Sequence, residues 1–459
     1  MARPVEHERT EPQLTSPLSL GIDFGTTNTV VALADGSGPA HLVRFPAPEG
    51  NLFAFRSCLS FHAPADHPSE RAIAAGPWAI EAYVEDPADT RFIQSFKSFA
   101  ASENFTETQV LGRRYRFEDL LSTFLLKLRA YAEAEMIDLP ARVIVGRPVI
   151  FAGAAPKEAV ALDRYETAFR RMGFSEILYA YEPVGAAFFF ARELTHDATV
   201  LVGDFGGGTS DFSIIRFERA PSGNGSGKGA SEIRAIPLGR SGVGVAGDAF
   251  DFRIIDNLVS PALGKGSSYQ SFGKTLPIPN RYYSAFARWD QLALMRASRD
   301  MREIRRLVRD ASEPEKLARL VETLDENYGY QLYRSVSRLK EALSAADRAT
   351  FRFAAGSITL EGEVRRATFE GWIAPDLALI EGAVDAALAD AGLAPGQIDR
   401  VFLTGGSSLV PAVRAIFHRR YEASRIETGA ELESIASGLA LIGRERDLDR
   451  WTTRSQPEP

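Results

Sequence analysis

The chain has 459 residues, of which 45% are hydrophobic and 25% are charged, and it contains a single cysteine, Cys58. This composition is typical of a globular protein with two to four domains, and it excludes a disordered chain and a disulfide-stabilised fold. The net charge of -7 argues against nucleic acid as a partner, because a phosphate backbone is bound by basic surfaces.

The chain begins with polar, proline-rich residues 1–17, which lack the apolar core of a signal peptide and are predicted to form a disordered tail. The longest apolar stretch, residues 183–191, is too short for a membrane span, which needs ~20 residues. We therefore expect a cytoplasmic protein without a membrane segment. The charged and proline-rich residues 446–459 are predicted to form a second tail.

Strand and helix patterns alternate between these ends. Short apolar runs bounded by glycine, aspartate or asparagine have the pattern of buried strands. These runs are residues 19–23, 29–34, 142–146, 199–204 and 400–405. Helical periodicity appears between them, at residues 117–136 and 409–421. The alternation predicts an α/β protein with mostly parallel sheets.

Two further segments have a composition of their own. Residues 281–345 are rich in arginine, glutamate and leucine and nearly free of glycine, which predicts a helical subdomain. Residues 220–230 consist largely of glycine and serine and predict a flexible hairpin tip or surface loop.

An internal repeat is the strongest sign of organisation. The segment LGIDFGTTNTVVALA (20–34) is matched about 180 residues later by LVGDFGGGTSDFSII (201–215). In each copy an apolar strand ends in Asp-Phe-Gly, small or hydroxyl residues follow, and strand character resumes. Two copies of an acidic, glycine-rich turn predict the two walls of one cleft.

These turns have the chemistry of a phosphate site. Glycine lets successive backbone N–H groups approach an anion, and the hydroxyls of Thr26, Thr27 and Thr209 can add donors. Asp23 and Asp204 would then face the phosphates, which is favourable only with a divalent cation between them. Ordinary turn chemistry explains one such segment equally well, but two matched copies favour phosphate.

Three motifs in order resemble those of the superfamily of actin, sugar kinases and seventy-kilodalton heat-shock chaperones. GIDFGTTNTVVAL (21–33) and VGDFGGGTSDFSI (202–214) resemble its two phosphate motifs, and VFLTGGSSLVPAVRAIF (401–417) resembles its adenosine motif. YEPVGAAFFFA (181–191) resembles the connecting stretch of the heat-shock chaperones in particular. The resemblance covers residues 18–445.

The resemblance implies an α/β protein with a two-lobed, actin-like ATPase fold, in which each lobe has a ribonuclease-H-like mixed sheet flanked by helices and a smaller inserted subdomain. The expected bounds are 18–196 for the first lobe, with an insertion at 46–116, and 197–445 for the second, with a helix-rich insertion at 242–372. As an alternative, residues 430–445 belong to the first lobe rather than to the second. No substrate-binding domain is expected, as in the short bacterial YegD-type members.

The implied ligands are ATP or ADP and Mg²⁺. The implied phosphate contacts are Gly25, Thr26, Thr27, Asn28, Gly206, Gly207, Gly208 and Thr209. The implied nucleoside contacts are Gly247, Asp248, Lys340, Ser344, Gly405, Gly406, Ser407 and Leu409. Asp23 and Asp204 would hold Mg²⁺ through water. The implied catalytic residues are Lys97, Glu182, Asp204 and Asp211.

Some of these residues have plainer interpretations. Taken alone, Lys97 fits a surface lysine whose stem lies on apolar neighbours, and Glu182 fits an acid at a helix N-terminus. The glycines of residues 242–247 match a dinucleotide-binding turn, but no acid ends a strand ~20 residues later. The family's two adenine-stacking arginines are replaced by Leu409 and Glu341, which leaves base specificity open.

Three classes of function remain. The first is an ATP-hydrolysing, chaperone-like switch that acts on a protein partner. The second is a kinase for a sugar or carboxylate on the same fold. The third is a scaffold that binds nucleotide without hydrolysing it. The presence of Lys97, Glu182, Asp23 and Asp204 favours the first.

Overall fold

The computed structural model describes residues 19–455 with short gaps. The gaps are 36–37, 48–49, 64–70, 87–88, 154, 192–193, 220–232, 285, 287–294, 296–297, 430–432 and 446. The predicted tail at 1–17 and the predicted loop at 220–230 lie outside the described residues.

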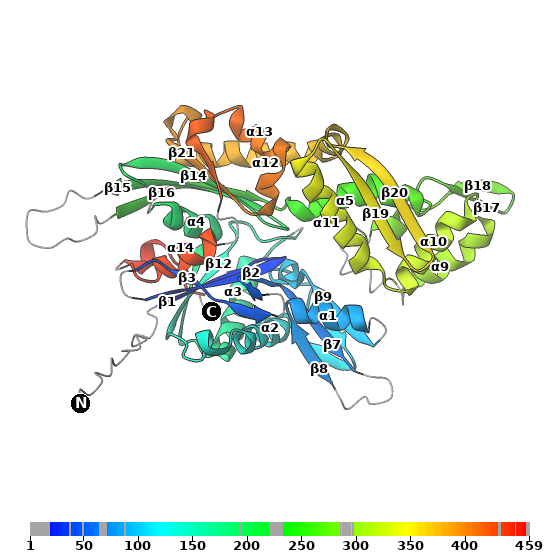
Figure 1. Ribbon diagram of the computed structural model, residues 1–459, viewed down its shortest axis with the longest axis horizontal. Coiled ribbons are helices and arrows are strands. Elements are labelled where there is room, and N and C mark those ends of the chain that lie inside the picture. The colour runs from blue at the N-terminus through cyan, green and yellow to red at the C-terminus, as the bar shows by residue number, and fades with distance from the viewer. Residues whose placement is uncertain are drawn as a thin grey trace, which may run out of the picture.

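Two large mixed sheets form the centre of the molecule (Figure 1). The first has the order β13-β12-β1-β2-β3, with β6 also paired to β2, and the second has the order β16-β15-β14-β21-β22. The strands of the first are β1 (Ser19–Phe24), β2 (Asn28–Ala34), β3 (His41–Leu42), β6 (Ala54–Arg56), β12 (Arg142–Arg147) and β13 (Glu176–Tyr181). Those of the second are β14 (Ala198–Phe205), β15 (Ser210–Arg219), β16 (Ile233–Val243), β21 (Arg400–Thr404) and β22 (Ile426–Thr428).

The two sheets repeat one topology. In each, an antiparallel hairpin, β1-β2 or β14-β15, is followed by two strands that pair in parallel. The predicted strands and the internal repeat are thus confirmed. The prediction of mostly parallel sheets is wrong, because tight turns join β1 to β2 and β14 to β15 and force each pair to run antiparallel. Strand β16 also pairs with β15 in the antiparallel sense.

Helices cover these sheets on both faces. The first sheet packs one face against α2 (Phe117–Tyr131) and α3 (Glu158–Met172), in a core rich in phenylalanine. The second sheet is covered by α12 (Arg366–Ala391) and α13 (Pro411–His418). The predicted helices at 117–136 and 409–421 are confirmed, although each α-helix ends earlier than its apolar pattern.

Two helices lie between the sheets and touch each other through their backbones (Figure 1). They are α4 (Glu182–Ala191) and α14 (Ser434–Ile442). A methyl group added at Gly438 would lie 1.7 Å from the carbonyl oxygen of Gly185. One added at Gly21 of β1 would lie 2.3 Å from the carbonyl oxygen of Ala436. Helix α14 thus packs directly on β1.

A small outer sheet contacts a helix of the 281–345 segment. The small sheet of β7 (Cys58–His62), β8 (Ala72–Ala75) and β9 (Thr90–Gln94), with α1 (Pro77–Glu85), contacts α11 (Gly329–Ala345). The Tyr330 ring packs edge-on against Tyr83 and Phe92, at centroid distances of 6.1 and 5.8 Å. The Tyr83 hydroxyl donates to the carbonyl oxygen of Asn327 over 2.8 Å.

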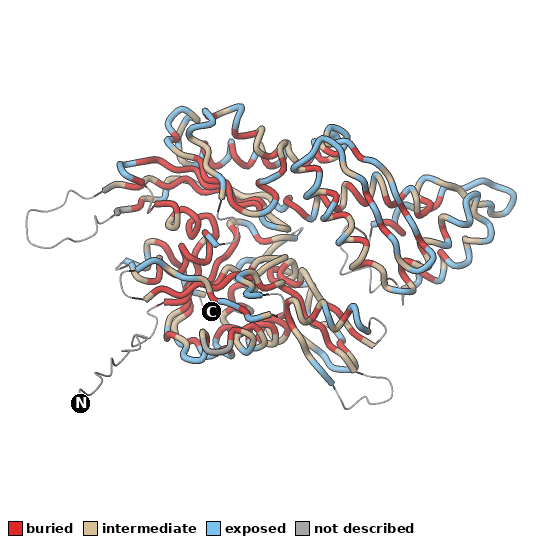
Figure 2. The backbone as a smooth tube through the Cα atoms, viewed as in Figure 1, coloured by how far each residue is buried: buried red, intermediate tan, exposed pale blue. Residues whose placement is uncertain are grey.

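The helical prediction for 281–345 holds for the described part, and hairpins flank it. Its helices are α7 (Arg281–Ser284), α9 (Arg299–Leu307), α10 (Pro314–Asp325) and α11. The hairpins are β17 (Ser268–Ser271) with β18 (Lys274–Pro277) and β19 (Arg348–Ala355) with β20 (Ile358–Arg365). This end of the molecule is more exposed than the central sheets (Figure 2).

The C-terminal segment is not the free tail that its composition predicts. Trp451 is buried and packs edge-on against Phe188 of α4, at a centroid distance of 4.9 Å. Thr453 exchanges two backbone hydrogen bonds of 2.9 Å with Tyr179 of β13. One aromatic residue thus anchors an otherwise polar segment. Within the described residues, none of the helices combines the length and apolar character needed to cross a membrane.

Candidate functional site

The two glycine-rich turns face each other and are closed in the same way. The Gly25 N–H donates to the carbonyl oxygen of Asn28 over 2.9 Å, and the Gly206 N–H donates to that of Thr209 over 3.0 Å. A methyl group added at Gly207 would lie 2.8 Å from the Thr27 hydroxyl oxygen. Turns separated by about 180 residues therefore meet at their tips.

A third segment contacts the second turn. The N–H groups of Gly247 and Asp248, at the start of α5 (Gly247–Ile254), donate to the carbonyl oxygens of Gly206 and Gly207 over 3.3 and 2.8 Å. Lys340 of α11 donates to the Gly247 carbonyl oxygen over 3.2 Å. The structure thus brings Gly247, Asp248 and Lys340 to the turns.

The adenosine-type motif approaches the same turn from β21. The Ser407 hydroxyl donates to the carbonyl oxygen of Gly206 over 3.4 Å. Gly405 has φ +82°, and a methyl group there would lie 2.3 Å from the carbonyl oxygen of Phe205, so glycine is required. Gly406 follows in the 3-10 turn Gly406–Leu409.

The residues expected around the base are more open. The side chain of Leu409 is 43% exposed, and Glu341 lies on the exposed face of α11. The Ser344 hydroxyl donates to the carbonyl oxygen of Lys340 in its own helix over 3.0 Å. The turn side of the site is therefore built by many contacts, whereas the base side presents exposed side chains.

Lys97 and Glu182 form a buried ion pair beneath the turns. The Lys97 Nζ lies 2.7 Å from the Glu182 Oε1, and the two side chains are 9% and 6% exposed. Lys97 belongs to the 3-10 helix η1 (Phe96–Phe99), and Glu182 is the first residue of α4. Burial opposes the charge on Lys97, but Glu182, Tyr165 and Asp23 outweigh it and raise the lysine pKa. The interpretation of Lys97 as a surface lysine is wrong, because burial and pairing replace its hydration.

Three aspartates surround this pair, and each has a raised pKa. Loss of hydration and repulsion by Glu182 raise the pKa of Asp23 to about 7, although Lys97 opposes the shift. Burial, Glu182, Asp23 and Asp211 raise the pKa of Asp204 well above its usual range. Burial and Glu182 raise the pKa of Asp211 to about 7. Four acids thus share one lysine, and the cluster favours an added cation.

The way Asp211 is held suits a positioning role. Its Oδ1 accepts hydrogen bonds from the N–H groups of Val149 and Ile150, over 2.7 and 3.3 Å. Asp211 lies opposite Asp204 in the register of the antiparallel hairpin β14-β15. Across the described ranges, no three His, Cys, Asp or Glu side chains are arranged to ligate a metal directly.

Replacement of Asp211 with asparagine should flatten the pH dependence of stability. The folded pKa of about 7 exceeds the unfolded value of 3.8, so the folded state retains a proton that the unfolded state loses. The free energy of unfolding should therefore fall as pH rises from 4 to 7. Urea unfolding at pH 5 and pH 8, without nucleotide, measures the free energy of unfolding. If that free energy falls equally between the two pH values in Asp211→Asn and in the unmodified protein, the prediction is contradicted.

Sequence reasoning missed Asp251 and Tyr165. Asp251 pairs with Lys340 over 2.9 Å and lies three residues after Asp248 on α5, so helical spacing from Asp248 could have indicated it. Tyr165 of α3 is fully buried and packs edge-on against Phe24, at a centroid distance of 5.9 Å. Nothing in the local sequence indicates that Tyr165 lies beside Lys97.

The fold and these contacts define a mixed α/β protein with a duplicated sheet and a candidate site where the two copies meet. Comparison with known proteins agrees with this description. The family model described as Hsp70 protein matches residues 312–444. Two relatives named Chaperone protein DnaK, from two strains of Thermus thermophilus, are 26% and 25% identical over 445 residues, which is 94% of this chain. The chain is thus similar to members of the Hsp70 family. It spans 62% of the length of each of these two relatives.

Proposed function

We propose that the chain binds ATP or ADP with Mg²⁺ between two lobes of an actin-like ATPase fold and hydrolyses ATP as a nucleotide-driven conformational switch. The observation that carries this proposal is the meeting of two identically closed glycine-rich turns beside the buried Lys97–Glu182 pair. The two sheets, with α4 and α14 between them, would be the two lobes. This arrangement supports lobe movement coupled to the ligand.

The turns are suited to the phosphates. Their N–H groups and the hydroxyls of Thr26, Thr27 and Thr209 would donate to phosphate oxygens. Asp23 and Asp204 would hold Mg²⁺ through water, and the excess of acids over lysine in the cluster fits this cation. When bound, Mg²⁺ supplies neutralisation of the phosphate charge.

The protein groups would act mainly by positioning. Lys97 would orient the terminal phosphate, and Glu182 would hold the lysine through their 2.7 Å contact. Asp211, fixed by two backbone N–H groups, would orient the attacking water. Phosphoryl transfer needs little proton transfer from side chains, so alignment and charge account for the rate.

The nucleoside would lie along α5, α11 and the 3-10 turn at Gly406–Leu409. Lys340 donates to the Gly247 carbonyl oxygen there, and the Ser407 hydroxyl lies beside Gly247. Leu409 would supply apolar contact where the family has a stacking arginine. We therefore propose ATP as the ligand, with weaker selection among bases than an arginine clamp provides.

The proposed partner is a cytoplasmic protein. The relatives carry the name chaperone protein. Lobe movement would act on a partner polypeptide.

Turnover of ATP by the purified protein with no acceptor tests the proposal. Hydrolysis to ADP supports the switch, and strict dependence on an added sugar or carboxylate would favour a kinase. Tight binding without turnover would favour a scaffold. A parallel titration with ATP and GTP measures base selection at Leu409 and Glu341.

Replacement of Tyr330 with alanine should speed the release of ADP about fivefold, because aromatic contacts contribute about 1 kcal/mol. Tyr330 joins the outer segments through Tyr83 and Phe92, and opening of the cleft must break this contact. Stopped-flow release of a fluorescent ADP measures the rate. Tyr328→Ala is the control, because it removes a nearby ring that packs on the core of the second sheet. Equal release rates in the two variants would show that the contact does not limit opening.

A further inference from the structure

The segment that carries Lys97 has little regular structure of its own. The helix η1 is a single 3-10 turn, and such turns are marginal without outside support. Ser95, just before it, has φ +53°, a left-handed conformation that costs energy for a residue other than glycine. The position of the Lys97 ammonium therefore depends on what the flanking residues contact.

One guanidinium group binds four backbone carbonyl oxygens at and after the end of η1. The Nη1 of Arg164 donates to the carbonyl oxygens of Phe99, Ala100 and Ser102, over 3.0, 2.8 and 3.1 Å. Its Nη2 donates to that of Phe105 over 2.7 Å. The four carbonyl oxygens span residues 99–105, so one side chain binds most of this loop. The Lys157 N–H, just before α3, adds one hydrogen bond of 2.9 Å to the Ala101 carbonyl oxygen.

Arg164 is itself held on a rigid element. It lies in the middle of the fifteen-residue helix α3, and its guanidinium carbon lies 5.8 Å from the centre of the Phe117 ring. The next residue, Tyr165, is buried against Phe24, which follows Asp23. One turn of α3 thus contacts the core beneath the acids and the loop after Lys97.

We propose that Arg164 is a positioning residue for Lys97, which holds η1 so that the lysine ammonium stays beside Glu182. The side chain does not touch the acids, and it acts through the backbone of residues 99–105. Arginine suits this task because its planar fork presents several donors at fixed angles, whereas a lysine presents one point charge. The kinetic part of this inference rests on the proposed function, and its structural part does not.

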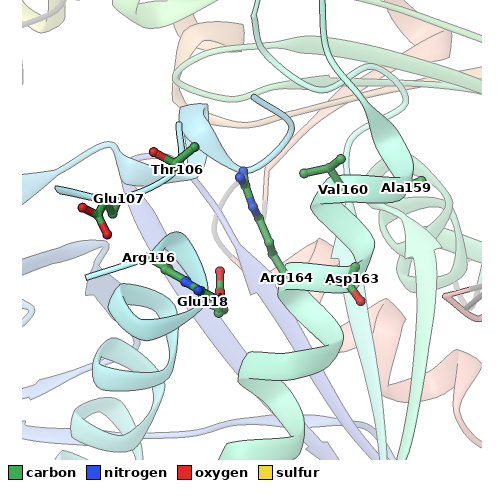
Figure 3. Close-up of a pocket in the computed structure, with 8 residues that line it drawn as sticks. All are labelled: Thr106, Glu107, Arg116, Glu118, Ala159, Val160, Asp163 and Arg164. Atoms are coloured by element: carbon green, nitrogen blue, oxygen red, sulfur yellow. Dashed lines mark ion pairs between the residues drawn. The ribbon is translucent and has the colours of Figure 1, made fainter. Parts of the chain in front are cut away.

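Figure 3 shows Arg164 among the residues that line a pocket. Arg164 projects from α3 into a pocket of about 510 Å³, whose lining includes Arg116, Glu118 and Asp163. In Arg164→Ala the pocket would extend to the four carbonyl oxygens. Free guanidinium ion, at concentrations too low to unfold the protein, could then occupy the place of the lost side chain.

The test compares Arg164→Ala with Arg171→Ala, which removes a guanidinium two turns further along the same helix. Arg171 pairs with Asp119 over 2.7 Å, on α2 rather than on the loop after Lys97. We expect kcat to fall about 10- to 100-fold in Arg164→Ala, with little change in KM, because misplacement of a catalytic group lowers kcat. Added guanidinium ion should restore part of kcat, and urea at the same concentration should not.

A second measurement needs no nucleotide. The acetylation rate of Lys97 by an activated acetate ester, followed by peptide mass spectrometry, reports whether the amine is held beside Glu182. We expect the rate to rise about tenfold in Arg164→Ala, relative to exposed Lys274 in the same sample, with an intermediate rate in Arg164→Lys. Arg171→Ala should leave it unchanged.

The outcomes separate the two proposals. If the unmodified protein does not hydrolyse ATP, the proposed function fails, and the acetylation rates still decide the role of Arg164. If Arg164→Ala and Arg171→Ala acetylate at the same rate and respond alike to guanidinium ion, Arg164 is an ordinary structural residue and the inference is overturned.

Discussion

Replacement of Lys97 with methionine is expected to reduce ATP turnover about 100- to 1,000-fold, the usual effect of removing one fixed charge from a transition state. The ammonium is buried 2.7 Å from Glu182 and its pKa is raised, so it stays charged at neutral pH. Methionine has a similar length and no charge. Single-turnover hydrolysis measures the chemical step, and nucleotide binding should be retained because the two turns are untouched.

The same substitution leaves Glu182 buried without its partner, which costs about 3–5 kcal/mol of stability. The double variant Lys97→Met with Glu182→Gln separates the two effects. It should recover most of the lost stability and none of the lost turnover. Lys274→Met, on an exposed hairpin, is the control for loss of a lysine charge. Turnover within a fewfold of normal in Lys97→Met would remove Lys97 from the mechanism.

Replacement of Gly438 with alanine should destabilise the protein by about 3 kcal/mol or more. The added methyl group would lie 1.7 Å from the Gly185 carbonyl oxygen, far inside any distance that nonbonded atoms adopt. Helices α4 and α14 must then separate. Because α4 begins at Glu182, the shift should also displace the carboxylate that holds Lys97. Chemical unfolding measures the loss of stability.

Gly382 provides a matched control in the helix α12. A methyl group added there meets nothing within 4 Å. Gly382→Ala should therefore stabilise the protein by about 0.5–1 kcal/mol, the ordinary benefit of alanine over glycine within a helix. The opposite signs separate close packing from helix propensity. A neutral effect of Gly438→Ala would show that the two helices pack less closely than the structure indicates.

Features encoded in short segments were predictable from the sequence. The strands at the two turns follow from apolar runs that end in Asp-Phe-Gly, and the repeat predicted that Thr27 and Gly207 belong to facing turns. Lys97 could be indicated only by its place in the family pattern, because its local segment equally suits a surface residue. Its burial depends on Glu182, which lies 85 residues away.

Contacts between distant segments could not be predicted in this way. The periodicity of α3 predicts a helix but does not say that Arg164 faces the loop after Lys97. The C-terminal segment has the composition of a tail, yet Trp451 finds a partner in Phe188. Composition describes a segment by itself, whereas these contacts depend on surfaces that exist only after the sheets have formed.

The position of α14 also has a consequence for synthesis on the ribosome. Its residues Ala436 and Ala440 cover Val30, Ala32 and Ala34 of β2. This apolar face must stay uncovered until residue 440 has emerged, although its strand is among the first parts made. Contacts so distant along the chain form late, and exposed strand surface invites aggregation. We therefore expect that another protein must cover this face of the nascent chain until α14 is released.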